Sequence, residues 1–448
     1  MKKDFFTHLT DLATKNNHIP AIDYDRYNIK RGLRNANGTG VLVGLTEIGN
    51  VDGYDIVDGV KIPKEGRLFY RGIDLFDLVD GFQTERRRGF EETAFLLLFG
   101  KLPTIEELDL FNTILDEHRD LPAGFTDSMI IGIPAKNVMN KLQRSTLVLY
   151  SYDDNPDDLS MRNLMEQSLN LIAKFPTMIS YGYQSKARAF DGKSLYIHPP
   201  KKNVGTAENI LHMIRPNNKY SALEAETLDL LLVIMAEHGG GNNSTFATHV
   251  VASTGTDTYS AVATAVGSLK GPKHGGANLK VCQMIEAIKS EVEDWSDKAQ
   301  LRTYLERLLN KDAFDKKGLI YGMGHAVYTK SDPRSVLLQK KAKELAIEKD
   351  RIQEFELYAN IESITRALFY ERKGPHAHIA SNVDLYSGFV LEMLGIPKDL
   401  YTPIFATSRI AGWCAHRLEQ LLSDDKIIRP AYRTVNELHH YYPLKERK

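Results

Sequence analysis

Apolar residues recur every three or four positions along most of this chain, and that period restricts it to a mainly α-helical fold. The pattern is clearest in residues 91–98, 161–172 and 223–235. At 448 residues the chain is long enough for more than one domain and can bury a sizeable core. We therefore expect a large helical protein.

Residues 40–72 break the helical period. β-Branched residues alternate there with repeated Gly and Asp-Gly turn signals, in the segment GVLVGLTEIGNVDGYDIVDGVKIPKEGRLFYRG. This composition predicts a small sheet near the N-terminus.

Local signals also place helix ends near possible functional residues. Ser221 and Glu224 form a capping box for a helix that we expect to run to about residue 237, where a glycine run ends it. His238 lies at that junction. Asp332 and Pro333 predict the start of another helix.

The charge balance excludes several classes of partner. The chain has 57 basic and 58 acidic residues, so no net field attracts nucleic acid or an anionic membrane. Cys282 and Cys414 form neither a CxxC pair nor a disulfide framework. The N-terminal segment lacks an apolar signal-peptide core, and no apolar run is long enough to span a bilayer. We expect a soluble cytoplasmic protein.

Several segments place ionisable residues among glycines, where the backbone can approach a ligand closely. They are HGGGNNST, GPKHGGAN, YGMGHAVYTKSDPR, NVDLYSG, FATSRIAGWCAH and IIRP. A single histidine or aspartate in such a place is more often a helix cap or a satisfied core residue. The combination of histidines, a carboxylate and arginines in one chain favours a catalytic site.

These residue types suit the removal of a proton next to a carbonyl group. Asp384 lies in an apolar context that raises its basicity, so it is our candidate base. His274 precedes a predicted helix start, which favours a neutral imidazole that donates a hydrogen bond to a developing enolate. His325 is a second candidate donor. Three arginines suit bidentate binding of carboxylates, namely Arg334, Arg409 and Arg429.

In their order and spacing, these segments resemble the signature regions of the citrate synthase family, from about residue 66 to residue 430. The resemblance implies that His274 assists enolisation, that His325 protonates the carbonyl of the oxo acid, and that Asp384 removes the methyl proton. It implies oxo-acid binding by a set of polar residues: His238, Arg334, Arg409 and Arg429. Arg429 would reach across from the partner subunit of a homodimer.

The resemblance also implies a coenzyme A site and a fold. The coenzyme A site would be bordered by Leu319, Gly322, Met323, Gly324 and Asn382. The fold would be a two-domain helical one, with a large domain in residues 1–274 and 385–448 and a small domain in residues 275–384 that lines the active-site cleft. Binding of the oxo acid would close this cleft. No metal and no cofactor other than the coenzyme A thioester would be needed.

The implied activity is the condensation of acetyl-CoA with oxaloacetate, with 2-methylcitrate synthesis from propionyl-CoA as the alternative. The two acyl groups differ by one methylene, which a pocket distinguishes by only about 1–3 kcal/mol. Ala326 and Leu385 stand where many family members have Arg and Phe, so the acyl preference stays open.

Other functions fit the sequence less well. HGGG is similar to the oxyanion-hole segment of lipases, but the chain has no G-x-S-x-G nucleophile elbow. His376 and His378 suggest zinc, yet they lack a third ligand at a recognisable spacing. A helical scaffold without catalysis would have no use for His274, His325 and Asp384 in glycine-rich settings.

Overall fold

The computed structural model describes residues 2–35, 37–374, 376–424 and 426–447. The chain forms two compact units. The terminal unit is Met1–Val43 with Arg429–Lys448, and the main unit is Gly44–Ile428.

The terminal unit contains short helices and extended segments. Its helical elements are α1 (Lys2–Asn16), α2 (Ala21–Arg26), η1 (Arg31–Leu33) and η5 (Leu444–Glu446). The guanidinium group of Arg433 lies 4.5 Å from the ring centroid of Tyr27, so a cation–π contact joins the two ends of the chain within this unit.

The main unit begins with the small sheet. Strands β1 (Gly49–Val57), β2 (Val60–Tyr70) and β3 (Ile73–Asp74) are antiparallel, in the order β1-β2-β3. Gly49 pairs with Tyr70, and the register shifts between Asp52 and Tyr54. The predicted β region is confirmed, although its first strand begins at residue 49.

Helices make up most of the rest of the main unit, so the predicted mainly α fold is confirmed. They are α3 (Leu75–Thr84), α4 (Phe90–Phe99), α5 (Ile105–His118), η2 (Thr126–Ile131), α6 (Val138–Leu149), η3 (Tyr150–Tyr152), α7 (Met161–Asp191), α8 (Thr206–Ile214), α9 (Ala222–Met235), α10 (Asn243–Ala252), α11 (Thr258–Lys270), α12 (Ala277–Glu291), α13 (Lys298–Leu309), α14 (Pro333–Glu348), α15 (Ile352–Lys373), α16 (Asp384–Met393), η4 (Lys398–Leu400) and α17 (Tyr401–Ser423).

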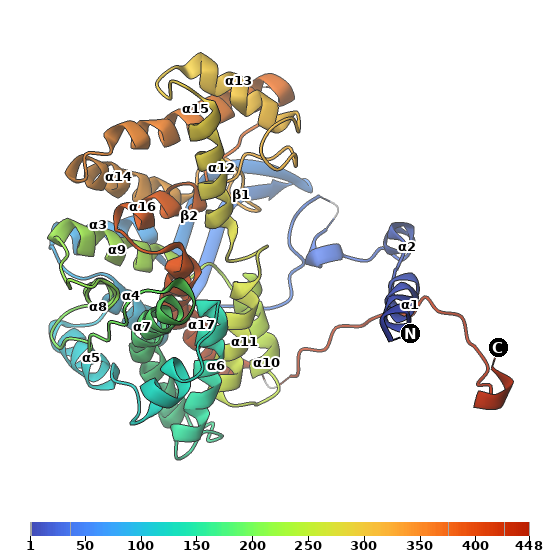
Figure 1. The fold of residues 1–448 in the computed structure, drawn as a ribbon, viewed down its shortest axis with the longest axis horizontal. Coiled ribbons are helices and arrows are strands. Elements are labelled where there is room, and N and C mark those ends of the chain that lie inside the picture. Colours follow the sequence, from blue (N-terminus) through green and yellow to red (C-terminus); the bar gives the residue numbers. More distant parts are fainter. Residues whose placement is uncertain (1, 36, 375, 425, 448) are drawn as a thin grey trace. The chain divides into compact units, whose positions relative to one another are not determined.

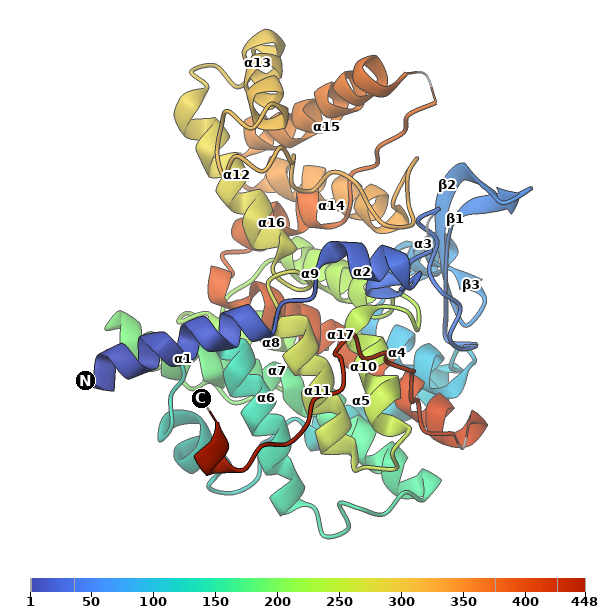
Figure 2. The same ribbon diagram turned by 90° about the vertical axis from the view of Figure 1, so that its right-hand side faces the viewer.

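Two helices form the centre of the core. Almost every residue of α17 from Tyr401 to Leu418 is buried, and this helix packs against α4, α7, α9, α10 and α11. Helix α7 is buried over most of its length. Both views place α12, α13, α14 and α15 together at one end of the main unit (Figures 1 and 2). The boundary of a small domain at residues 275–384 stays a prediction.

The predicted helix starts arise from local hydrogen bonds. Ser221 Oγ accepts from the Glu224 amide, and the Glu224 carboxylate accepts from the Ser221 amide, which completes the capping box of α9. Asp332 caps α14 by accepting from the Arg334 amide at 3.0 Å. Helix α9 ends at Met235, so Glu237 and His238 lie just beyond it.

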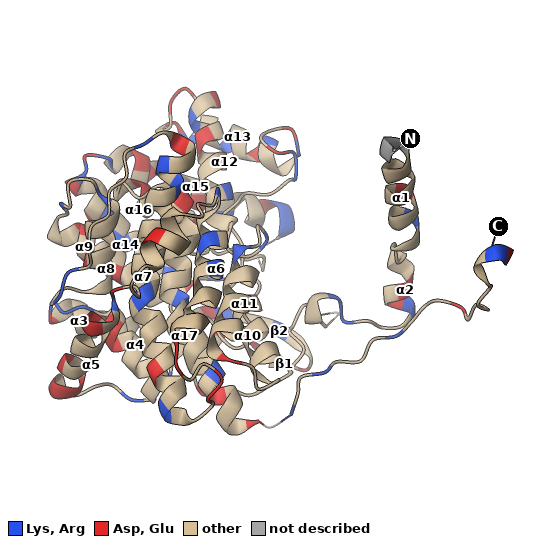
Figure 3. Cartoon of the chain, turned by 60° about the horizontal axis from the view of Figure 1, so that its bottom comes forward, with Lys and Arg blue, Asp and Glu red and all other residues tan. Residues whose placement is uncertain are grey.

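Acidic and basic residues are interspersed along the helices of the main unit (Figure 3). Within the described part of the chain, no helix has both the length and the apolar character needed to cross a bilayer.

Candidate active site

The turn after α9 leaves one nitrogen of His238 available to a ligand. Gly239 adopts a φ of +80°, and its amide contacts the carboxylate of the buried Glu237. His238 is half-buried between them. Its Nε2 atom is shielded from solvent and has no hydrogen-bond partner among the described residues. Such an atom is a natural contact for a bound polar group.

Local backbone contacts fix the ring of His325. Its Nδ1 atom accepts hydrogen bonds from the amides of Val327 and Tyr328, both at 3.1 Å. A ring nitrogen that accepts carries no proton, so the proton of a neutral His325 lies on Nε2. The ring stacks on Tyr328 with centroids 4.7 Å apart and meets the His238 ring edge-on at 5.2 Å.

Two loop segments hold His325 near Asp384. Gly324 donates its amide to the Ala380 carbonyl at 2.7 Å, and Asn382 donates its amide to the Gly322 carbonyl at 2.9 Å. The Asn382 side chain also donates to the Gly324 carbonyl at 2.8 Å. Gly322 has a φ of +85°, and a Cβ atom there would lie 3.0 Å from the Cα of Leu385. Only glycine permits this approach.

Asp384 is the first residue of α16 and is half-buried. Its amide donates to the Asn382 side chain at 3.0 Å. Burial raises the pKa of the Asp384 carboxyl to about 6, although the positive charges of Arg334 and Arg409 oppose the shift. A carboxylate with this pKa is a stronger base than an ordinary aspartate, as the sequence predicts.

His274 lies between α11 and α12 and is held by a serine. Its Nε2 atom lies 3.1 Å from Ser244 Oγ, which also accepts from the indole N–H of Trp413 at 3.1 Å. Burial, assisted by the charge of Arg409, lowers the pKa of His274 to about 4. The imidazole is therefore neutral at pH 7. The sequence attributed this neutrality to a helix start, whereas burial is the largest cause.

Two buried arginines complete the cluster. Arg334 donates from Nε and Nη2 to both carboxylate oxygens of Asp332, at 3.0 and 2.7 Å. Arg409 donates from Nε to the Met235 carbonyl at 2.6 Å, at the end of α9. Burial and then Arg334, His325 and Arg409 hold the pKa of His238 well below its usual value. The arginines thus face neutral histidines, an environment that favours an anionic ligand.

We call these side chains the central cluster: His238, His274, His325, Arg334, Asp384 and Arg409. They come from segments far apart in the sequence and interact electrostatically in the folded chain.

The other predicted residues lie outside the cluster. Gly322, Met323, Gly324 and Asn382 form the paired loop segments beside it, and Leu319 is exposed at the start of the same loop. Arg429 is exposed in the terminal unit, and its part in the site stays a prediction.

Sequence reasoning missed some residues that support the cluster. Ser244 lies in the quoted segment HGGGNNST and Trp413 in FATSRIAGWCAH, so both were near known signals. Tyr328 follows His325 by three residues. Nothing in the local sequence distinguishes these supporting side chains from ordinary core residues.

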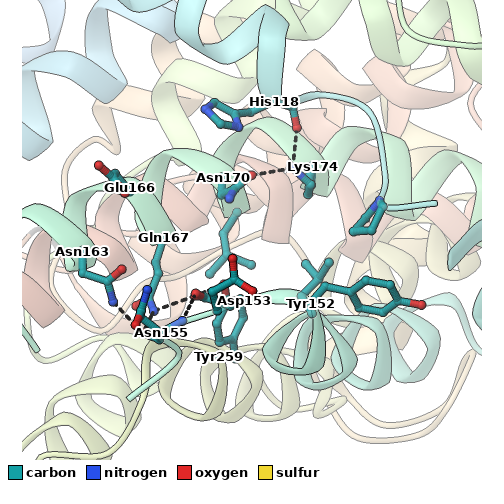
Figure 4. Close-up of a pocket in the computed structure, with 14 residues that line it drawn as sticks. His118, Tyr152, Asp153, Asn155, Asn163, Glu166, Gln167, Asn170, Lys174 and Tyr259 are labelled. Atoms are coloured by element: carbon teal, nitrogen blue, oxygen red, sulfur yellow. Dashed lines mark hydrogen bonds between the residues drawn. The ribbon is translucent and has the colours of Figure 1, made fainter. Parts of the chain in front are cut away.

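A separate polar pocket of about 420 Å³ lies between α7 and the start of α11 (Figure 4). Lys174 donates to the His118 carbonyl at 2.8 Å, and Asp153 accepts from Gln167 at 2.8 Å and from Tyr259 at 2.7 Å. These polar groups bind one another, and none belongs to the central cluster. We assign this pocket no part in the chemistry.

Known proteins are similar to this chain in sequence and in fold. A family model described as "Citrate synthase, C-terminal domain" matches residues 35–431. The chain is 35% identical over 413 residues to citrate synthase of Haloferax volcanii, covering 91% of this chain and 96% of that protein. It is 32% identical over 395 residues to 2-methylcitrate synthase 1 of Corynebacterium glutamicum. This match covers 86% of this chain and 94% of that protein. The crystal structure of citrate synthase from Thermotoga maritima superimposes with a TM-score of 0.72 at 30% identity. The superposition covers 94% of this chain and 99% of that chain.

Proposed function

The chain belongs to the citrate synthase family, and from this premise we propose that its central cluster is the site where acetyl-CoA condenses with oxaloacetate and water to give citrate and CoA. The enzyme is of the acyltransferase type. One observation carries the assignment of the site. Two neutral imidazoles and a carboxylate of raised pKa surround two buried arginines.

We assign the first proton transfer to Asp384. The methyl group of a thioester is a weak acid, so its base needs a pKa near the working pH. Because the pKa of Asp384 is about 6, most of this carboxyl is ionised at pH 7 and still more basic than an ordinary aspartate. It takes the methyl proton as the enolate forms.

His274 stabilises that enolate by donating a hydrogen bond to the thioester oxygen. A neutral imidazole carries one N–H, and the direction of the hydrogen bond between Nε2 and Ser244 Oγ determines which nitrogen has it. When the serine hydroxyl donates to Nε2, the proton lies on Nδ1 and is available to the substrate. Trp413 donates to the same oxygen and holds the serine in place.

The oxo acid binds through the positive side of the cluster. Two hydrogen bonds to Asp332 occupy Nε and Nη2 of Arg334, which leaves Nη1 for a substrate carboxylate. Arg409 supplies a second cation. His238 and His325 donate from Nε2 to the ketone oxygen, and His325 gives up its proton as the new carbon–carbon bond converts the ketone to an alcohol. Water then hydrolyses the thioester.

We assign the coenzyme A contacts to the paired loop segments. The residues are Leu319, Gly322, Met323, Gly324 and Asn382, whose backbone lies directly beside His325 and Asp384. No metal or cofactor takes part in any step. Closure of residues 275–384 over the oxo acid would keep water from the thioester until condensation is complete.

We also propose a homodimer in which Arg429 of one subunit binds the oxo acid of the other. Co-expressed Arg429→Ala and Asp384→Asn chains test this arrangement. In a mixed dimer one site would carry both substitutions and the other neither, so activity returns. Two inactive homodimers that stay inactive when mixed contradict it. The cytoplasmic location stays a prediction.

The release of CoA tests the reaction itself. A thiol reagent should detect CoA formed from acetyl-CoA only when oxaloacetate is present, with one citrate for each CoA. Release that is independent of oxaloacetate would indicate a simple thioesterase and would contradict the proposal.

Propionyl-CoA is the alternative acyl donor, because 2-methylcitrate synthases are among the relatives. Comparing kcat/KM for the two thioesters at fixed oxaloacetate distinguishes them. A pocket selective by one methylene gives a ratio of about 10 to 200. We expect the ratio to favour acetyl-CoA.

A further inference from the structure

A second cluster of imidazoles and carboxylates joins α10 to α17. It consists of His249 from α10 with His416, Glu419 and Gln420 from α17, and Glu237 from the turn after α9. None of these side chains has a role in the proposed reaction. We call them the α10–α17 cluster.

Three atoms of this cluster converge on one point. His249 Nε2 lies 3.0 Å from His416 Nδ1, which lies 3.6 Å from Glu419 Oε2. One ligand atom from each of the three residues lies within 4.8 Å of the others. Nitrogen and oxygen ligands about 2.0–2.2 Å from a tetrahedral zinc ion are separated from one another by roughly 3.3–3.5 Å. Two of the three separations, 3.0 and 3.6 Å, are close to that spacing.

The outward-facing nitrogens each lie near an acceptor oxygen. His249 Nδ1 lies 2.8 Å from Gln420 Oε1, and His416 Nε2 lies 3.1 Å from Glu237 Oε1. Both facing atoms are acceptors to which the outer nitrogens can donate, and the inner nitrogens can bind a cation once any proton on them is released. Histidines that bind metals are oriented in this way, with the second ring nitrogen donating to a carboxylate or a carbonyl oxygen.

The two oxygens of the Glu419 carboxylate differ in their hydrogen bonds. Its Oε1 atom accepts from the Glu47 amide at 2.7 Å. Its Oε2 atom is buried and has no hydrogen-bond partner among the described residues. A buried carboxylate oxygen in this position can bind a cation.

Two ring nitrogens and a carboxylate oxygen face one another at this point. A proton held between the two nitrogens leaves Glu419 Oε2 without a hydrogen bond, and zinc binding would displace that proton. A metal ion satisfies all three. We propose that His249, His416 and Glu419 bind one Zn²⁺ ion, with water in the fourth position.

This ligand set selects among metals. Two imidazoles and a carboxylate suit zinc, whereas Mg²⁺ and Ca²⁺ prefer sites made of oxygen ligands alone. His416 is fully buried, but His249 and Glu419 are half-buried, so an ion can reach the site without global unfolding. The site is separate from the exposed His376 and His378, which have no third ligand among the residues that the structure describes.

Calorimetric titration of the full chain after chelator treatment tests the proposal. We expect one equivalent of Zn²⁺ to bind and to raise the melting temperature, since an ion that binds only the folded chain stabilises it. Mg²⁺ should do neither. Absence of a stoichiometric zinc site would overturn the proposal.

Variants locate the site and exclude adventitious binding. His249→Gln and Glu419→Gln should each weaken zinc binding at least tenfold, and far-ultraviolet circular dichroism checks that each variant folds. The double variant His376→Gln, His378→Gln removes the exposed pair and should bind zinc as the unaltered chain does. If that control loses the ion while His249→Gln keeps it, the site lies elsewhere and the proposal is wrong. Binding is measured without substrates, so its outcome is independent of the proposed reaction.

Discussion

Two histidine clusters in this chain have opposite electrostatics. In the central cluster, burial and the neighbouring arginines hold the pKa of His238 well below its usual value. In the α10–α17 cluster, burial opposes the charge of His416, but the carboxylate of Glu237 outweighs it and raises the pKa to about 9. His416 is buried, and the Nε2 atom of His238 is shielded from solvent. The difference comes from the charge of the group that each ring faces.

This contrast explains what each cluster would bind. The central cluster brings arginines and neutral imidazoles together, so an anion completes it. The α10–α17 cluster brings carboxylates and imidazoles together, so a cation completes it. Burial alone therefore does not determine the role of a histidine. The sign of the neighbouring charge determines it.

The largest expected effect comes from removing the base of the central cluster. Asp384→Asn keeps the size of the side chain and its place at the start of α16, but it cannot take a proton. Loss of a general base lowers kcat by about 10²–10⁴-fold. The kcat for CoA release measures the loss.

Binding of oxaloacetate to Asp384→Asn is the control, because the arginines remain. Calorimetry should give a dissociation constant within a few-fold of the original. A variant that turns over at near-normal rate would show that the base assignment is wrong.

In the second cluster, Glu237→Gln breaks the pair with His416. The substitution leaves a fully buried imidazole facing a neutral amide, and breaking a buried ion pair costs about 3–5 kcal/mol of unfolding free energy. Urea denaturation of the zinc-free chain measures this loss.

Glu166→Gln is the matched control, because Glu166 pairs with Arg162 on the exposed face of α7. Exposed pairs contribute about 0–1 kcal/mol. Equal losses at the two positions would contradict the contrast between buried and exposed charge.

The pH dependence of kcat/KM tests the electrostatics of the central cluster. Asp384 acts as a base only when ionised, and its pKa is about 6. As the pH falls below 6, protonation removes the base, and kcat/KM should drop by about tenfold for each pH unit. His274, whose pKa is about 4, stays neutral through this range and adds no second step. A pH–rate profile from pH 5 to pH 8 that is flat would contradict the raised pKa.

The sequence predicted those parts of the fold that depend on local interactions. The capping box of Ser221 and Glu224 and the cap at Asp332 involve residues within three positions of each other, so a short segment contains the whole signal. The resemblance placed Gly322, Gly324 and Asn382 together at one coenzyme A site. The hydrogen bonds by which Asn382 joins Gly322 and Gly324 are seen only in the folded chain.

Long-range contacts were beyond sequence reasoning. His249 and His416 are 167 residues apart. Trp413 and Ser244 are 169 residues apart. His416, Trp413 and Ser244 lie in the quoted segments, but nothing in those segments indicates which residue each one contacts. Tertiary packing creates these pairs, and no local pattern encodes them.

The smallest effect tests how a supporting side chain acts on the central cluster. Ser244→Ala removes the hydroxyl that orients His274, while His274 itself remains. One hydrogen bond of this kind contributes about 0.5–1.5 kcal/mol, so kcat should fall by roughly 2–13-fold with little change in KM for oxaloacetate. Ser268→Ala is the control, since Ser268 Oγ binds Asn243 at 2.6 Å and does not contact His274. Ser244→Thr keeps a hydroxyl and should restore part of the rate. If Ser244→Ala instead raises KM for oxaloacetate and leaves kcat unchanged, the serine serves oxo-acid binding rather than the orientation of His274.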